Sequence, residues 1–235
     1  MVKATGVILA GGKSRRMGVD KAFLAVGCEA MIERVAIELA KVFDEVLISG
    51  GSADAGRKLG LKVLPDLILG GGPLSGIHAS LKGSSHEKCL FVACDMPFVN
   101  SSLARFMIEQ SEGYDAVVPQ HGIFYQPLFA VYSRGCIQTI EEFLASRKYK
   151  IADFYSHVRV NFISEKYLQA FADIDTMFFN VNTPVDLEKA RGMAENNNES
   201  GAPVVKDPIP KDVCFIDPGS QAQNTKKPWP KRDSI

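Results

Sequence analysis

The sequence predicts an α/β fold built on a mostly parallel sheet, and three observations lead to it. Short apolar runs at residues 6–9, 46–48 and 89–93 are typical of strands that are buried on both faces. Between the first two runs, apolar residues from Met31 to Val42 recur at helical spacing and mark one apolar face of a helix. A strand, a helix and a strand in this order form a right-handed unit whose strands are parallel.

Composition limits the classes of function. The 235 residues hold 27 basic and 27 acidic side chains, which argues against a broad nucleic-acid or anionic-membrane surface, so we expect no nucleic-acid and no membrane partner. No apolar run approaches the roughly 20 residues that span a bilayer, and no signal-peptide layout precedes the first strand. The expected location is cytoplasmic. Five cysteines without a CxxC pair fit neither a disulfide framework nor a zinc site.

The first apolar strand ends in paired glycines, followed by a basic segment. Gly11 and Gly12 allow a ligand to approach the backbone N–H groups closely, and successive N–H groups form an anion-binding hollow. Arg15, Arg16 and Lys21 add positive charges that suit phosphate groups. The glycine spacing matches neither a P-loop nor a dinucleotide fingerprint. We therefore predict a polyphosphate-holding loop of another type.

A second glycine-dense segment follows a predicted strand at residues 61–64. Gly70, Gly71 and Gly72 precede Pro73, which suits the first turn of a helix that runs to about Lys82. Two interpretations are open: a flexible turn, or the opposite wall of the pocket that the first glycine loop begins.

The strand at residues 89–93 ends just before Asp95. A carboxylate at the carboxyl end of a central strand is well placed to hold Mg²⁺ against a triphosphate, although it can equally cap the following turn. Beyond it, Asn100 is expected to cap a helix that reaches Gln110. The remaining expected elements are a strand at 115–119, a loop at 121–125, a strand-like run at 126–131, helices at 136–146 and 151–155, and a strand at 158–162. We assign the elements within residues 121–146 to an acceptor side, where a second substrate would bind.

Near its end the domain carries a second polar motif. Asn180 and Asn182 alternate with a valine and are expected on one face of a strand end, where they serve a binding site or only tie the strand to the next helix. Thr183 is a predicted N-cap, with Pro184 at the first helical position and Asp186 completing a variant capping box. We expect a domain over residues 1–195 and a disordered tail over 196–235, since the tail lacks an apolar period.

The run from Leu9 to Lys21 reads LAGGKSRRMGVDK, and it resembles the signature of nucleotidylyltransferases. The resemblance is strongest to the molybdenum cofactor guanylyltransferase (MobA) family, and it covers approximately residues 5 to 192. It implies a three-layer, Rossmann-like, mostly parallel sheet with helices on both faces, of the nucleotide-diphospho-sugar transferase type.

The same resemblance implies roles for individual residues. The implied GTP-binding residues are Leu9, Ala10, Gly11, Gly12, Lys21, Ser49, Asp66, Gly72, Gly76 and Asp95. The implied catalytic residues are Arg16, Lys21 and Asp95, with Asp95 as the Mg²⁺ ligand. Asn180 and Asn182 are the implied acceptor contacts.

The implied function is transfer of GMP from GTP to molybdopterin, with or without its molybdenum, with release of pyrophosphate. The implied cofactor is Mg²⁺, and molybdoenzymes or their chaperones are possible further partners. One alternative is a related nucleotidylyltransferase that uses CTP with molybdopterin, or a nucleoside triphosphate with a sugar phosphate. The form Leu-Ala-Gly-Gly at residues 9–12 favours GTP. Another alternative is a nucleotide-binding module without catalysis, whose tail recruits a partner.

Overall fold

A computed structural model describes residues 1–11 and 21–200 of the chain, with side chains up to residue 196. The strands are β1 (Val2–Leu9), β2 (Ala25–Val26), β3 (Glu29–Ala30), β4 (Phe43–Ser49), β5 (Lys62–Leu64), β6 (Lys88–Ala93), β7 (Ala116–His121), β8 (Phe124–Tyr125), β9 (Phe129–Ser133) and β10 (Val160–Ser164). The helices are α1 (Met31–Ala40), α2 (Ala53–Leu59), α3 (Pro73–Gly83), α4 (Ser101–Glu109), α5 (Ile137–Ala145), α6 (Ile151–Phe154), α7 (Glu165–Leu168), α8 (Ile174–Met177) and α9 (Pro184–Ser200). Short 3-10 turns are η2 (Lys21–Phe23), η3 (Arg134–Cys136) and η4 (Tyr155–His157).

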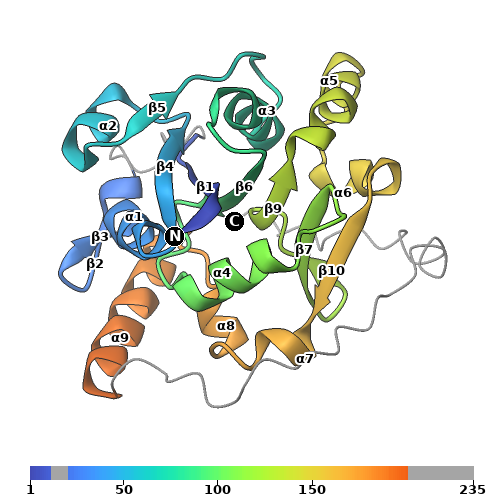
Figure 1. The fold of residues 1–235 in the computed structure, drawn as a ribbon. Helices are drawn as coiled ribbons and strands as arrows, with labels where there is room; N and C mark the ends of the chain where they lie inside the picture. The colour runs from blue at the N-terminus through green and yellow to red at the C-terminus, as the bar shows by residue number, and fades with distance from the viewer. Residues whose placement is uncertain (12–20, 201–235) are drawn as a thin grey trace.

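One sheet runs through the centre of the molecule in the order β10-β7-β9-β6-β1-β4-β5, with β8 paired to β7 (Figure 1). Strands β6, β1, β4 and β5 are mutually parallel, and β7 is parallel to β10. Strand β9 is antiparallel to both β6 and β7, so β7 and β10 point the same way as β1. The predicted mostly parallel sheet is confirmed.

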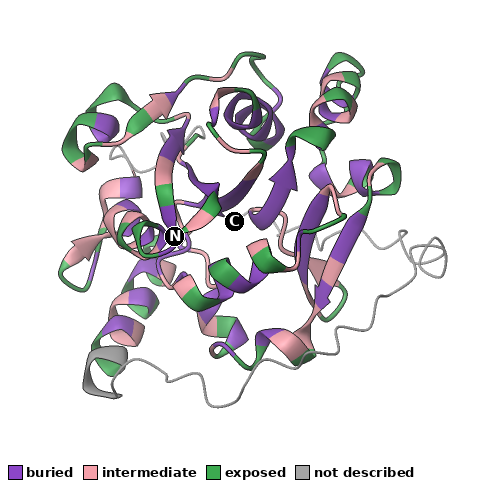
Figure 2. Ribbon diagram, viewed as in Figure 1, coloured by how far each residue is buried: buried purple, intermediate pink, exposed green. Residues whose placement is uncertain are grey.

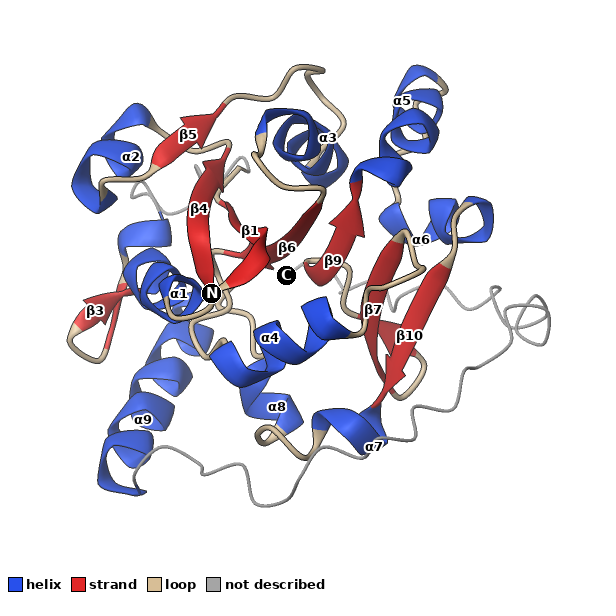
Figure 3. Cartoon of the chain, viewed as in Figure 1, coloured by secondary structure: helices blue, strands red, loops and turns tan. Residues whose placement is uncertain are grey.

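Helices cover both faces of this sheet, as Figure 3 shows, and give three layers. Consecutive residues of β1 serve opposite faces: Ile8 packs in the core beneath α1 and α4, whereas Val7 packs beneath α3 and α5. Residues 4–9 are all buried, and all of them except Thr5 are apolar, as expected for a strand covered on both faces (Figure 2). A smaller third core joins α9 to the β2–β3 hairpin.

The predicted helix ends are confirmed at three places. Asn100 caps α4 by accepting a 2.9 Å hydrogen bond from the Leu103 N–H, and Pro73 is the first residue of α3. At α9, the Thr183 Oγ1 accepts from the Asp186 N–H at 3.1 Å, while the Asp186 carboxylate accepts from the Thr183 N–H at 2.9 Å. This reciprocal pair is the predicted capping box, with aspartate at the position that glutamate usually takes.

Several predicted elements were wrong. Helix α1 ends at Ala40, so Val42 lies beyond it, although its side chain is still buried. The predicted loop at residues 121–125 holds the end of β7 and strand β8, joined by a tight turn in which Gly122 has φ of 58°. Asn180 and Asn182 lie in an irregular segment and not on a strand end.

Helix α2 and the β2–β3 hairpin were not predicted. Ser52 caps α2 through a 3.3 Å bond from the Ala55 N–H, and Gly60 ends it with φ of 65°. At the other end of the chain, α9 continues to Ser200, past the predicted domain boundary at residue 195. The rest of the predicted tail, residues 201–235, lies outside the described residues. Among the described residues, no helix has the length and apolar character that a bilayer crossing requires.

Candidate active site

The carboxyl ends of the central strands form one edge of the sheet. Leu9 at the end of β1 lies opposite Ser49 of β4 and Ala93 of β6. Backbone hydrogen bonds continue past the strands, from the Ala10 N–H to the Ser49 carbonyl at 2.9 Å and from the Cys94 N–H to the Leu9 carbonyl at 3.1 Å. The loops that follow β1, β4 and β6 therefore leave the sheet side by side, where open α/β sheets bind their ligands.

The first glycine loop packs backbone to backbone against the loop after β4. A Cβ atom added to Gly50, which has φ of 68°, would lie only 2.9 Å from the Gly11 Cα. Ala10 is half-buried and Gly11 is exposed, so the chain reaches the edge at Gly11. Gly12 and Arg16, the next predicted site residues, lie outside the described residues.

Lys21, Asp95 and Asn182 come together at this edge from three distant parts of the sequence. The Lys21 Nζ donates a 2.8 Å hydrogen bond to the Asn182 carbonyl, and the Val181 N–H donates a 2.9 Å bond to the Asp95 carbonyl. Burial raises the pKa of the Asp95 carboxyl, while the nearby Lys21 ammonium acts in the opposite direction. Lys21 and Asp95, two of the predicted site residues, thus lie near each other at the end of the sheet, while their predicted roles are not tested.

The two asparagines behave differently. The Asn180 side-chain amide donates a 2.8 Å hydrogen bond to the Phe178 carbonyl, which orders the irregular segment locally. Asn182 reaches the site through its main-chain carbonyl. Their predicted contact with an acceptor therefore stays a prediction.

The second glycine segment stands at the N-terminus of α3. Gly71 is packed tightly, because an added Cβ would lie 2.2 Å from the Leu144 Cδ2 and 2.5 Å from the Ser75 Oγ. Gly70 and Gly72 have φ of 87° and 61°, and nothing lies within 4 Å of a Cβ added to either. The segment is thus anchored at Gly71, while space remains beside Gly70 and Gly72. It lies at the N-terminus of α3, the end of a helix that favours anions.

Ser49 and Gly76 contact each other. Gly76 lies inside α3 and not in the loop before it, and a Cβ added there would lie 2.7 Å from the Ser49 Oγ. Ser49 is only 1% exposed, and its hydroxyl has no hydrogen-bond partner among the described residues. The structure therefore places both residues in the packing between α3 and the sheet, while their predicted contact with a nucleotide is not tested.

Asp66 follows β5 at the same edge. The Gly50 N–H donates a 2.9 Å hydrogen bond to the Leu64 carbonyl, which ties the end of β5 to the loop after β4. Asp66 is half-buried, and burial raises the pKa of its carboxyl. It is a second acidic group near the predicted pocket.

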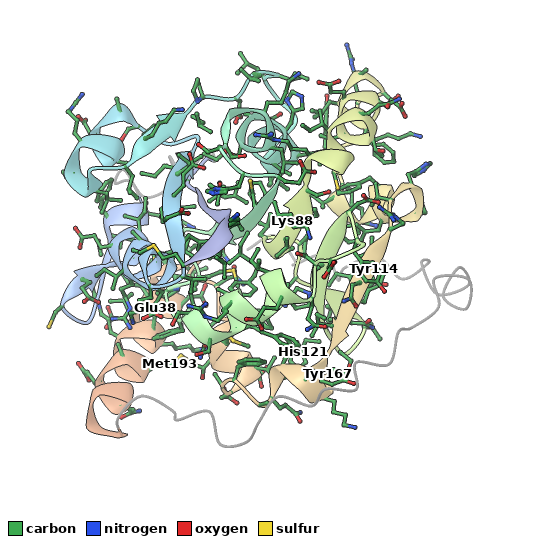
Figure 4. All side chains as sticks on the ribbon, in the orientation of Figure 1. Glu38, Lys88, Tyr114, His121, Tyr167 and Met193 are labelled. Atoms are coloured by element: carbon green, nitrogen blue, oxygen red, sulfur yellow. The ribbon has the colours of Figure 1, made fainter. Side chains whose placement is uncertain are left out.

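His121, labelled in Figure 4, is the last residue of β7 and lies in the region predicted to bind the acceptor, a role that is not tested. The His121 Nε2 lies 3.7 Å from the Glu165 Oε2, and its Nδ1 lies 3.9 Å from the Asp175 Oδ1. With Asp173, these side chains line a polar hollow of about 300 Å³. Helix α8, which carries Asp175, leads into the segment that meets Asp95 and Lys21.

Arg34 is a supporting residue that the sequence did not reveal. Its Nε donates to the Pro97 carbonyl at 3.1 Å, and its guanidinium lies 5.7 Å from the centre of the Phe98 ring. The same side chain contacts the Glu29 carboxylate at 3.1 Å. Arg34 therefore joins the loop after Asp95 to the β2–β3 hairpin. Its sequence signal is weak, because it is one charged residue in an ordinary amphipathic helix.

A metal held by protein ligands alone does not fit the described residues. Within residues 1–11 and 21–196, no group of three or more histidine, cysteine, aspartate or glutamate side chains could hold a metal ion. Mg²⁺ usually takes one or two carboxylates and completes its shell with phosphates and water. The carboxylate of Asp95, half-buried at the edge beside a lysine, fits an ion that arrives together with a nucleotide.

Sequence comparisons show the family to which this chain belongs. A family model for the MobA-like NTP transferase domain matches residues 6–160. A probable molybdenum cofactor guanylyltransferase from Pelotomaculum thermopropionicum is 66% identical over 197 residues, covering 84% of this chain and 96% of that protein. Another, from Carboxydothermus hydrogenoformans, is 37% identical and covers 80% of this chain and 95% of that protein.

Solved structures show the same relationship. Molybdopterin-guanine dinucleotide biosynthesis protein A from Archaeoglobus fulgidus has a TM-score of 0.71 at 26% identity, covering 82% of this chain and 99% of that chain. The 2-C-methyl-D-erythritol 4-phosphate cytidylyltransferase from Thermus thermophilus, at 19% identity and a TM-score of 0.57, covers 80% of this chain and 98% of that chain and shares the fold alone. This chain therefore belongs to the MobA-like NTP transferase family, as its first glycine loop predicts, and within that family to the molybdenum cofactor guanylyltransferases.

Proposed function

We propose that this chain transfers GMP from GTP to molybdopterin, releases pyrophosphate and forms molybdopterin guanine dinucleotide, which then passes to molybdoenzymes or their chaperones. The observation that carries the proposal is the meeting of Lys21, Asp95 and Asn182 beside the first glycine loop, at the carboxyl edge of the sheet. The 66% identity to a protein named as a probable guanylyltransferase supports the choice of substrates.

The reaction joins two anions, so neutralising charge is the main task of the site. A phosphate oxygen of molybdopterin attacks the α-phosphorus of GTP, and the bond from that phosphorus to the oxygen bridging the β-phosphorus breaks. In this scheme the Lys21 ammonium, held near Asp95 by the Asn182 carbonyl, stabilises the pyrophosphate that leaves. Asp95 must be ionised to bind a cation, and the Lys21 ammonium favours that state against the effect of burial.

Mg²⁺ bound to Asp95 and to the triphosphate would withdraw charge from the α-phosphate. Gly11 and the open glycines of the second loop allow phosphate groups to approach backbone N–H groups. No side chain has to form a covalent intermediate. Burial raises the pKa of the Cys89 thiol to about 11 and that of the Cys136 thiol to about 12. Both thiols therefore stay protonated at neutral pH and are poor nucleophiles, which agrees with a scheme without a covalent intermediate.

The proposal is tested by offering GTP, CTP and UTP separately with molybdopterin and Mg²⁺, followed by identification of the dinucleotide and measurement of pyrophosphate. We expect product with GTP and little with the other two nucleotides. Product with CTP in place of GTP would favour the related cytidylyl transfer. Nucleotide binding without pyrophosphate release, for any acceptor, would favour a module without catalysis.

Lys21→Ala extends the test to the site itself. We expect turnover to fall by about 100-fold or more, because a contact to the leaving group is lost. Lys41→Ala is the matched control, since Lys41 is an exposed lysine at the end of α1 that pairs with Glu38. Turnover near that of the wild type in Lys21→Ala would remove Lys21 from the mechanism.

A further inference from the structure

The peptide bond between Asn182 and Thr183 is held from both sides by opposite charges. On one side, the Lys21 Nζ donates to the Asn182 carbonyl at 2.8 Å. On the other side, the Thr183 N–H donates to the Asp186 Oδ2 at 2.9 Å. Because a trans peptide unit is planar, its C=O and N–H point in opposite directions. The ammonium and the carboxylate therefore lie at the two ends of one peptide dipole, each facing the pole of opposite sign, and both hydrogen bonds are charge-assisted.

Further bonds fix the same segment. The Asp186 Oδ2 also accepts from the Asn182 N–H at 3.1 Å, so one carboxylate orients two consecutive N–H groups. One residue earlier, the Val181 N–H is bound to the Asp95 carbonyl at 2.9 Å. The Asn182 carbonyl, which accepts the hydrogen bond from Lys21, therefore belongs to an irregular segment that is bound at one end to Asp186 and at the other to the loop of Asp95.

Asp186 is itself held in place by packing. Its neighbour Leu187 is buried in the small core that joins α9 to the hairpin after Lys21, which fixes this turn of the backbone independently of the bond from the Asp186 N–H to the Thr183 Oγ1. That core also contains Val26 and Val181. The start of α9 thus contacts both the segment that follows Lys21 and the segment that precedes Asn182. Residues 161–200 lie beyond the part of the chain that the family model matches.

We propose that Asp186 is a positioning residue that sets the place of the Lys21 ammonium beside Asp95 by orienting the Asn182–Thr183 peptide. The inference rests on the proposed function, in which Lys21 contacts the triphosphate. An ordinary helix cap would also place an acidic residue here. The two roles can be separated. The Thr183 hydroxyl makes the other half of the cap by accepting from the Asp186 N–H, and it binds neither the Asn182 N–H nor the Thr183 N–H that the Asp186 carboxylate orients.

The experiment measures the dissociation constant of GTP with Mg²⁺ by calorimetry for Asp186→Ala, Asp186→Asn and Thr183→Val. Each variant is made in the full-length chain, both with Lys21 present and with Lys21→Ala, and urea unfolding reports its stability. We expect Asp186→Ala to weaken GTP binding by about tenfold, and Asp186→Asn by less, because the amide oxygen still accepts but carries no charge. Thr183→Val should be less stable, as expected when a helix cap is removed, but its dissociation constant for GTP should stay within about twofold of the wild-type value.

The Lys21→Ala background decides the mechanism. We expect no further loss of affinity from Asp186→Ala there, because residues that act through one contact are not additive. A loss of the same size in both backgrounds, or an equal loss in Thr183→Val, would overturn the positioning role. If Asp186→Ala does not fold, Asp186→Asn in the two backgrounds gives the same comparison. If the wild type binds GTP but the effects of Asp186→Ala and Lys21→Ala on affinity are independent, only this inference is refuted. If the wild type binds no nucleotide, the proposed function is refuted as well.

Discussion

Gly76→Ala is expected to destabilise the protein although it improves helix propensity. The added Cβ would lie 2.7 Å from the Ser49 Oγ and 3.2 Å from the Leu9 Cδ2. Both neighbours are buried, at 1% and 8% exposure, so neither side chain can move out into solvent. The backbone of α3 must therefore shift away from the sheet, at the edge where the proposed nucleotide site lies.

The size of the effect follows from two opposing terms. Overpacking a well-filled core costs about 1–3 kcal/mol. Exchanging glycine for alanine inside a helix gains about 1 kcal/mol. We expect a net loss in the free energy of unfolding of about 1 kcal/mol, and at most about 2 kcal/mol. For a domain of this size, each kcal/mol lowers the melting temperature by about 2–4 °C.

Urea unfolding and thermal melting measure this loss, and Gly192→Ala is the matched control. Gly192 lies in α9 with nothing within 4 Å of an added Cβ, so the same exchange there should gain up to about 1 kcal/mol. Adding Ser49→Ala to Gly76→Ala should recover much of the loss, because the Ser49 Cβ lies 3.7 Å from the new methyl group, an ordinary contact. If Gly76→Ala proves as stable as Gly192→Ala, the packing argument is refuted.

Two further predictions follow from buried polar groups. Burial raises the pKa of the Asp95 carboxyl above its ordinary 3.8, so the folded state holds the proton more tightly and ionisation at neutral pH costs stability. Asp95→Asn should therefore be more stable than the wild type near pH 7 by urea unfolding, with the difference shrinking as the pH falls toward 3.8. Equal stability across this range would contradict the burial argument. If Asp95 holds the proposed Mg²⁺, the same variant should also lose turnover. The hydroxyl of Tyr132 donates to the Pro127 carbonyl at 2.9 Å and accepts from the Tyr155 hydroxyl at 2.8 Å, fully buried. Tyr132→Phe leaves both partners unsatisfied and should cost about 1–3 kcal/mol, whereas an unchanged urea midpoint would show that the pair contributes nothing.

The sequence predicted the parts of the fold that depend on continuous burial or on caps. Strand β1 was visible because both its faces are covered, and the start of α9 was visible because Thr183 and Asp186 stand at capping spacing. Helix α2 was missed because few of its seven residues are buried, although Ser52 and Gly60 mark its ends. The β8 turn was missed because β8 is only two residues long and pairs with the polar end of β7, at Gln120 and His121.

The site was predictable only where its chemistry resides in side chains. Lys21 and Asp95 were predicted from charge, glycine spacing and resemblance, and the structure brings them near each other. The carbonyl of Asn182 carries no signal, because every residue has one, and its orientation depends on packing between α9 and the β2–β3 hairpin. Burial of Ser49 under Gly76 could not be seen either, since it depends on how closely α3 approaches the sheet.

The bond between Lys21 and Asn182 joins residues that are 161 positions apart. During synthesis, the strands up to β6 can pair before the C-terminal third has been made, but this bond cannot form until residue 182 has left the ribosome. The contact on which the proposed mechanism rests would therefore form late, after most of the core is complete, and contacts of long sequence separation also carry the largest loop-closure cost. A chain cut short before α9 could keep most of a native sheet and still be inert.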